Sequence, residues 1–216
     1  MEEPALNLNQ KIARRVREMR QAKNLSLESM ALKSGVSRSM ISLIERGESS
    51  PTAVVLDKIA AALGVALATF FEEPDETGQK PTSPLVRHAA QPVWQDPASG
   101  YLRRNVSPSG LQLPLQIVEV LFPARKRVTF ETAFREATLN EQVWVLEGVI
   151  EITLGKESYR LQQGDCLAIH LDCPITYYNP TNKPARYAVV IASTTPVTNN
   201  RSGRSYLVVG KNKKAP

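Results

Sequence analysis

Aromatic and proline residues are distributed very unevenly along this chain. Every aromatic side chain lies at Phe70 or later, and only two of the 15 prolines precede Pro74. A segment without aromatic residues and almost without proline favours short packed helices, whereas aromatic, proline and β-branched residues together are typical of sheet. We therefore expect a two-domain α + β protein with the helical domain first.

The join between the two halves is acidic, rich in proline and without apolar periodicity. Residues 72–99 have five acidic and two basic side chains, and we assign them to an extended linker. The helical domain then comprises residues 1–71 and the β domain residues 100–195. Residues 196–216 have five basic side chains and no acidic one, and they form a basic C-terminal tail.

Composition and cysteine content indicate an ordinary intracellular protein. The chain is 42% hydrophobic, and its longest weakly polar run, residues 59–71, is too short to cross a bilayer. Its start lacks the basic-then-apolar pattern of a secretory signal, and two cysteines cannot build a disulfide framework. We expect a cytoplasmic protein with no membrane partner. Much of the net charge of +6 lies in the tail, so charge alone says little about nucleic acid.

Helical periodicity and capping residues divide the first half into five short helices. Ser26, Ser37 and Thr52 stand where they can cap the second, third and fourth helices. Gly35 allows a tight turn between the second and third. The fifth, over residues 67–71, closes the core, and the expected domain is a five-helix bundle.

Residues 25–47 have the arrangement of a helix-turn-helix. An eight-residue helix is followed by a turn around glycine and a second helix, whose N-terminal end such domains present to the major groove. The side chains at that end are short and polar apart from Arg38, whose guanidinium can hold O6 and N7 of a guanine.

The stretch LSLESMALKSGVSRSMISLIERGESSPTAVVLDKIAAALGV resembles the XRE-type, phage-repressor-like helix-turn-helix family almost without interruption. The resemblance implies a bacterial transcriptional regulator that binds a double-stranded DNA operator of specific sequence. It places three side chains against base edges and four against phosphates: Arg38, Ser39 and Ser42 for the bases, and Ser37, Arg46, Ser49 and Thr52 for the phosphates.

Two further positions can be compared with that family. Arg20 and Glu45 match a pair that forms a structural salt bridge in relatives. Leu27 stands where many relatives have a glutamine that helps to read DNA, so one polar contact with DNA is expected to be missing.

The second half consists of short apolar or alternating segments separated by turn residues. Seven of them are candidate strands: residues 115–122, 142–148, 149–154, 157–161, 166–171, 175–179 and 186–192. Their close, regular spacing predicts an all-β sandwich or barrel.

Two motifs in this half resemble those of the cupin family. EQVWVLEG starts at Glu141, and GDCLAIHLDCPITYYN starts at Gly164. The resemblance implies an all-β cupin domain, a double-stranded β-helix or jelly-roll barrel. Together with the first half, it implies a regulator whose barrel forms a homodimer and senses a small-molecule effector.

The histidines that hold the metal of a typical cupin are absent from the motif positions. Glu141 fills the glutamate position, but Ile175 stands at the histidine position of the second motif. The two histidine positions of the first motif fall, depending on loop length, at Phe134 and Glu136 or at Arg135 and Ala137. The chain has two histidines, too few for the usual three imidazoles, and a site of Glu141 and His170 alone has too few ligands. We therefore expect no metal, no cofactor and no enzymatic activity. The alternative is a metal-dependent cupin enzyme, which metal analysis would reveal.

The predicted interior of the barrel is apolar with one carboxylate and one phenol. Alternation along the strands places Val143 on the face of Glu141, and Tyr177 on the face of Ile175. With Phe134, these residues are the candidate ligand-binding set. Trp144 alternates with them and points outward, under another sheet or into a dimer contact.

A carboxylate buried in such an interior needs a cation or a hydrogen bond. In one hypothesis, Glu141 binds the amine or hydroxyl of a small metabolite such as an amine or an amino acid. In the other, it pairs internally with Arg104, Arg135 or Tyr177, and the barrel is a dimerisation module without ligand. The sequence does not decide between these two hypotheses.

Overall fold

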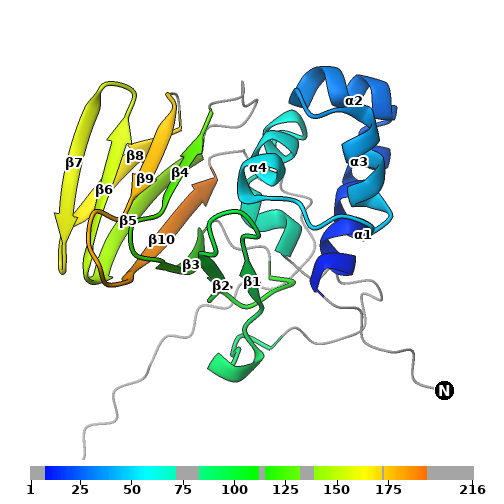
Figure 1. The fold of residues 1–216 in the computed structure, drawn as a ribbon. Helices are drawn as coiled ribbons and strands as arrows, with labels where there is room; N and C mark the ends of the chain where they lie inside the picture. Colours follow the sequence, from blue (N-terminus) through cyan, green and yellow to red (C-terminus); the bar gives the residue numbers. More distant parts are fainter. Residues whose placement is uncertain (1–7, 72–82, 112–114, 132–138, 172, 194–216) are drawn as a thin grey trace, which may run out of the picture.

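The computed structural model describes residues 8–71, 83–111, 115–131, 139–171 and 173–193 (Figure 1). The first half contains four α-helices: α1 (Leu8–Ala22), α2 (Leu27–Ser34), α3 (Arg38–Glu45) and α4 (Ala53–Ala62). The prediction of five helices is wrong in its last element, because Leu67–Phe71 forms a single 3-10 helix, η1. Five residues after a glycine stop are too few for a stable α-helix.

Side-chain caps start three of the four helices as predicted. The hydroxyls of Ser26, Ser37 and Thr52 each accept a hydrogen bond from a backbone N–H in the first turn of α2, α3 and α4. Gly35 ends α2 in the left-handed conformation, with φ at 67°, which lets the chain turn sharply into α3.

The inner faces of the helices meet in an aliphatic core. Ile12 of α1, Ile41 of α3 and Leu56 of α4 have no exposed surface. Burying a side chain of this size contributes about 1.5–3 kcal/mol. Packing, rather than intrinsic propensity, therefore stabilises helices as short as α2 and α3.

The second half is a sandwich of two antiparallel sheets. The six-stranded sheet has, in spatial order, β1 (Val93–Gln95), β2 (Leu102–Asn105), β3 (Leu115–Phe122), β10 (Ala185–Ser193), β5 (Leu139–Glu147) and β8 (Cys166–His170). The four-stranded sheet has β4 (Arg127–Phe130), β9 (Ile175–Tyr178), β6 (Val149–Leu154) and β7 (Glu157–Gln162). A short 3-10 helix, η2 (His88–Ala90), precedes β1.

Two predictions about this half need correction. Of the predicted sandwich or barrel, the structure has the sandwich: both sheets are open, each with two edge strands, so the hydrogen-bonded ladder does not close into a barrel. The six-stranded sheet also begins at Val93, inside the range 72–99 assigned to the linker. There β1 pairs antiparallel with β2, with Val93 opposite Arg104. Strands of three and four residues are too short to show a clear alternation. Residues 72–82 and the tail 196–216 lie outside the described residues.

The helical domain packs directly against the sandwich, with α4 and η1 facing it (Figure 1). Asp96 Oδ1 accepts a hydrogen bond of 2.8 Å from the backbone N–H of Ala53, at the start of α4. The ring of Phe71 in η1 lies 5.5 Å from that of Trp94 in β1. In the described part of the chain, no helix has the length and apolar character needed to span a membrane.

Candidate functional site

The predicted DNA-binding residues gather at α3 and the loop that follows it. Ser37 caps α3 through its hydroxyl, which accepts from the N–H of Met40 at 3.2 Å and lies 3.2 Å from Ser39 Oγ. Ser37, Arg38 and Ser39 are exposed, whereas Ile41 is turned into the core. The N-terminal end of α3 therefore presents a polar surface to solvent.

Two arginines of this surface are each held by a carboxylate. Arg38 Nε lies 2.6 Å from Glu28 Oε1, which joins the start of α3 to α2. Arg46 binds both carboxylate oxygens of Glu48 at 2.8 Å and also contacts Ser42 Oγ. The pKa of Glu48 is lowered by the hydrogen bonds from Arg46, and that of Glu28 by its own backbone N–H and by Arg38.

The last two predicted phosphate contacts lie next to this surface. The Ser49 hydroxyl points to the sulfur of Met40 at 3.9 Å. The Thr52 hydroxyl accepts from the N–H of Val55 at 3.3 Å as the cap of α4, and Thr52 is only partly exposed.

The pair predicted as structural is a bidentate ion pair. Arg20 donates from Nε and Nη2 to the two carboxylate oxygens of Glu45, at 2.7 and 2.8 Å. Its Nη1 donates to the carbonyl of Leu25 at 2.6 Å. The Arg20 and Glu45 side chains are 12% and 7% exposed. This pair joins the end of α1 to α3 and thus fixes the position of α3 relative to α1.

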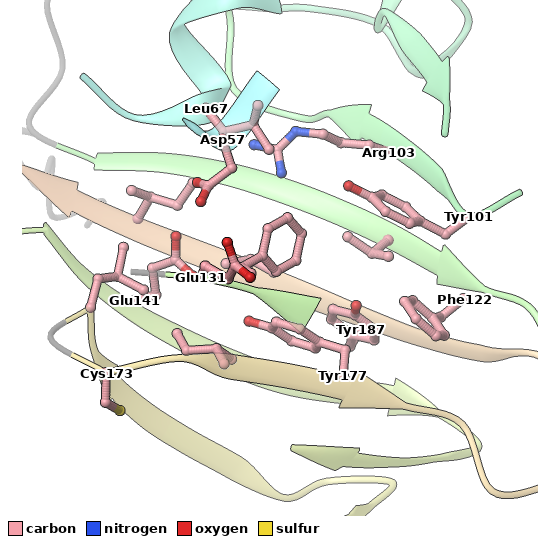
Figure 2. Close-up of a pocket in the computed structure, with 16 residues that line it drawn as sticks. Asp57, Leu67, Tyr101, Arg103, Phe122, Glu131, Glu141, Cys173, Tyr177 and Tyr187 are labelled. Atoms are coloured by element: carbon pink, nitrogen blue, oxygen red, sulfur yellow. The ribbon is translucent and has the colours of Figure 1, made fainter. Parts of the chain in front are cut away.

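The second candidate site is a pocket between the sandwich and the helical domain (Figure 2). It contains about 750 Å³ of space, part of it open to solvent. Its wall consists of aromatic and aliphatic side chains with one arginine and three carboxylates: Asp57, Leu67, Tyr101, Arg103, Val120, Phe122, Phe130, Glu131, Glu141, Leu171, Cys173, Ile175, Tyr177, Tyr187, Val189 and Ile191. Asp57 comes from α4 and Leu67 from η1, so both domains form this pocket.

Three of the five predicted ligand-binding residues line this pocket: Glu141, Ile175 and Tyr177. The prediction that Val143 contacts the ligand is wrong, because Val143 has no exposed surface and is not part of the pocket wall. Its register partners are Val189 and Leu167, and it packs among the strands of the sandwich core. Phe134 lies outside the described residues.

The aromatic wall of the pocket is made of buried rings: Tyr101, Tyr177 and Tyr187 are 4%, 6% and 3% exposed. Tyr177 and Tyr187 stack with their ring centroids 5.9 Å apart, and Tyr101 stacks on Phe122 at 5.8 Å. Burial raises the pKa of all three tyrosines well above the ordinary value, because a phenolate would have to form in an apolar surrounding.

Sequence reasoning missed the cation of this pocket. It named Arg104 as a partner for Glu141, but Arg104 points to the outer face of the sheet and pairs with Glu119 at 3.3 Å. Arg103 points inward, is 7% exposed and lines the pocket. The signal available in the sequence was the aromatic residue Tyr101, two positions earlier, since residues two apart share a face of a strand and an aromatic side chain favours the buried face.

The possible pair of Glu141 and His170 is not formed. His170 lies opposite Asn140 in the ladder between β5 and β8, whereas Glu141 lies opposite Ile169. His170 Nδ1 lies 2.7 Å from Asn140 Oδ1 and is exposed, so the two side chains occupy opposite faces of the sheet. Within the described ranges, no group of three histidine, cysteine or acidic side chains is arranged to hold a metal ion.

Comparisons with known proteins agree with both halves of the fold. Residues 16–70 match the helix-turn-helix family HTH_3, and residues 131–191 match the cupin domain family Cupin_2. The HTH-type transcriptional regulator PuuR of Escherichia coli is 29% identical over 186 residues, covering 86% of this chain and 95% of PuuR. SutR of the same organism, also an HTH-type transcriptional regulator, is 27% identical and covers 80% and 89%.

A solved structure shows the same arrangement of domains. The crystal structure of an HTH_3 family transcriptional regulator from Vibrio cholerae matches with a TM-score of 0.67 and 26% identity. The match covers 86% of this chain and 96% of that protein. Similarity therefore extends over both domains.

Proposed function

Because the chain is an XRE-type helix-turn-helix transcriptional regulator with a C-terminal cupin domain, we propose that it binds its operator as a homodimer and that its pocket senses a small metabolite. The observation that supports sensing is the composition of the pocket wall. Side chains of the DNA-binding domain and of the cupin domain face the same space, so an occupant contacts both.

The exposed end of α3 is the part that reads DNA. Arg38 has a side chain 65% exposed, and its guanidinium can exchange Glu28 for the edge of a guanine. Ser39 and Ser42 follow it on the same helix as the other proposed base contacts, and Ser37, Arg46, Ser49 and Thr52 are the proposed phosphate contacts.

The test of this readout is fluorescence anisotropy on a selected operator and on random duplex DNA. Arg38→Ala is expected to weaken operator binding roughly 10- to 100-fold and random-DNA binding only slightly. Arg14→Ala, at a half-exposed arginine on α1, is the matched control. Equal losses on both DNAs with Arg38→Ala would refute direct readout.

The proposed dimer forms through the outer apolar face of the six-stranded sheet, defined here as Leu115, Ile117 and Leu121 of β3 and Trp144 of β5. The exposed fractions of these four residues lie between 40% and 51%. Monomeric proteins rarely expose such a group of large apolar side chains on one face. Among them, Glu119 pairs with Arg104 and Arg186 at 3.3 and 2.9 Å, and Glu147 lies 3.7 Å from Arg186. Two carboxylates thus balance two guanidinium groups, so no unbalanced charge opposes association of two copies.

A two-fold dimer presents two copies of α3, which suits half-sites about 34–36 Å apart. Light scattering coupled to size exclusion measures the assembly. Trp144→Glu is expected to give monomers and to weaken operator binding, because two linked domains bind through effective concentration. Leu32→Glu, at a residue of α2 that is 88% exposed, is the matched control. A dimer that survives Trp144→Glu would exclude this face as the interface.

The test of sensing is the operator affinity in the presence of a panel of amines and amino acids. Glu141→Gln is expected to abolish the response, whereas Glu147→Gln, on the exposed end of the same strand, preserves it. If no compound changes operator affinity, the cupin domain is a dimerisation module only.

We also propose that the cupin domain is not an enzyme. The separation of Glu141 from His170 on opposite faces and the regulator names of PuuR and SutR support this. Elemental analysis of the purified protein tests it, because stoichiometric iron, manganese or zinc would favour a metal-dependent enzyme instead.

A further inference from the structure

Arg103, in the pocket wall, has a buried guanidinium with donors that lack acceptors. It is 7% exposed, and neither its Nε nor its Nη2 has a hydrogen-bond partner among the residues that the structure describes. Burial lowers its pKa, but a guanidinium still keeps its proton at neutral pH. A buried charge whose donors lack acceptors is costly, which indicates that these donors serve a bound group.

Two other arginines of this chain show what the guanidinium edge formed by Nε and Nη2 binds. Arg20 uses Nε and Nη2 to hold both oxygens of Glu45, at 2.7 and 2.8 Å. Arg46 uses the same two nitrogens for Glu48, at 2.8 Å each. The two parallel N–H groups match the spacing of carboxylate oxygens. The chemistry that fits the Nε and Nη2 of Arg103 is therefore a carboxylate.

The rest of the polar wall favours a cation in the same ligand. Three acidic residues and one arginine line the pocket, and Figure 2 shows the carboxylates of Asp57, Glu131 and Glu141 facing the space that Arg103 enters. Lys58 holds Glu131 at 2.7 Å, and Asp57 and Glu141 add negative potential to this wall. A plain carboxylate is repelled there and a plain amine does not satisfy Arg103, whereas a zwitterion meets both requirements.

We propose that the pocket binds a small amino carboxylate, with its carboxylate on the Nε and Nη2 edge of Arg103 and its ammonium toward Glu141 and Asp57. This deepens the proposed sensing function and rests on it. The stacked rings of Tyr177 and Tyr187 supply the apolar wall along which the carbon chain lies.

The position of Arg103 also connects this ligand to the DNA-binding domain. Its guanidinium carbon lies 5.4 Å from the ring centroid of Phe71 in η1, a cation–π contact across the domain boundary. A carboxylate bound to Arg103 neutralises the charge that attracts this ring, and Asp57 of α4 lies in the same pocket. Binding of the ligand therefore changes the contact that holds η1 and α4 on the sandwich.

Calorimetry on the full chain tests the ligand class. The probes are ω-amino carboxylates of two to six carbons, each compared with the amine, the diamine and the carboxylate of equal length. We expect at least one amino carboxylate to bind about tenfold or more tightly than its three counterparts. An amine or diamine that binds as tightly, or no heat from any probe, overturns the inference.

Variants at two adjacent arginines separate a role in binding from a role in folding. Arg103→Gln is expected to weaken amino carboxylate binding about 10- to 100-fold while leaving amine binding within threefold. Arg104→Gln, on the opposite face of the same strand, leaves both unchanged. Thermal unfolding without ligand confirms that both variants fold. A preference for the amino carboxylate that persists in Arg103→Gln refutes the assignment.

Operator binding distinguishes failure of this inference from failure of the proposed function. If an amine without carboxylate changes operator affinity, sensing stands and the amino carboxylate is wrong. If the amino carboxylate binds through Arg103 but operator affinity stays constant, the ligand assignment stands and sensing is wrong. Phe71→Leu is expected to retain ligand binding within threefold and to reduce the operator response, and an unchanged response refutes the connection through Arg103.

Discussion

Arginine side chains serve differently in the α3 surface and in the pocket. In the α3 surface, Arg38 and Arg46 are largely exposed, and each is held by a carboxylate within ten residues of it along the chain. In the pocket, Arg103 is buried and brought together with Asp57 and Glu141 by the packing of separate elements. The exposed arginines are free to exchange partners on a large polyanion such as DNA. The buried arginine suits a small partner that fills a defined space.

The largest difference between the two domains is expected in their stability at alkaline pH. Tyr101, Tyr177 and Tyr187 have pKa values raised by burial, and the helical domain, residues 1–71, has no tyrosine. A raised pKa in the folded state contributes stability that is fully present below the unfolded pKa near 10 and is lost as the pH rises above it. The sandwich should therefore lose stability above about pH 10, before the helices unfold.

Absorbance of tyrosinate at 295 nm and far-ultraviolet circular dichroism, recorded together, measure this difference. We expect part of the tyrosinate signal to appear only as the β-sheet signal is lost. If every tyrosine ionises near its ordinary pKa while the sheet signal is unchanged, the three buried tyrosines are more exposed to solvent than the structure shows.

The next largest effect is expected from Arg20→Ala, which breaks the ion pair that positions α3. Removing one partner of a mostly buried, bidentate pair leaves the Glu45 carboxylate without its cation. We expect the free energy of unfolding to fall by about 2–3 kcal/mol. Urea denaturation measures it, with Arg14→Ala as the control, since Arg14 and Glu18 are a half-exposed pair. Equal, small effects of both variants would show that the Arg20 pair does not stabilise the domain.

A smaller effect is expected from Asp96→Ala at the boundary between the two regions. Asp96 is 2% exposed and accepts hydrogen bonds from the N–H of Ala53 and from the N–H and hydroxyl of Ser99. Its removal leaves these donors without an acceptor, which costs about 1–3 kcal/mol. We also expect faster limited proteolysis between the domains. Asp96→Asn keeps one acceptor and should lose less, and identical losses would point to charge rather than hydrogen bonding.

The smallest effect is expected from Glu28→Gln. The change removes the carboxylate that holds Arg38 and a negative charge that repels phosphates. Because exposed ion pairs are worth about 0–1 kcal/mol, stability should barely change. Binding to random DNA should tighten about two- to fivefold at low salt and less at high salt. Anisotropy titrations at two salt concentrations check this, and unchanged affinity would mean that Glu28 does not compete with DNA for Arg38.

Much of the helical domain could be predicted from sequence because its signals are local. The hydroxyls of Ser26, Ser37 and Thr52 bond to backbone N–H groups three residues away, and these caps were predicted. The prediction for residues 67–71 was wrong in helix type, since five residues are too few to show a clear helical period and the segment forms a 3-10 helix. In the second half, every strand of five or more residues was predicted, and so was the four-residue β9, which lies in the GDCLAIHLDCPITYYN motif. The other strands of three or four residues, β1, β2 and β4, were not predicted, because segments this short show no clear alternation.

Sequence by itself determined that the chain joins a helix-turn-helix to a cupin domain, because caps, turns and motif spacings depend on residues close together in the chain. It also determined that the usual metal histidines are absent. Tertiary structure alone decided that Arg103 rather than Arg104 enters the pocket and that Asp57 meets it there. The physical reason is that a one-residue change in strand register reverses the face of every side chain, and that contacts between elements far apart in the chain depend on the packing of the whole fold.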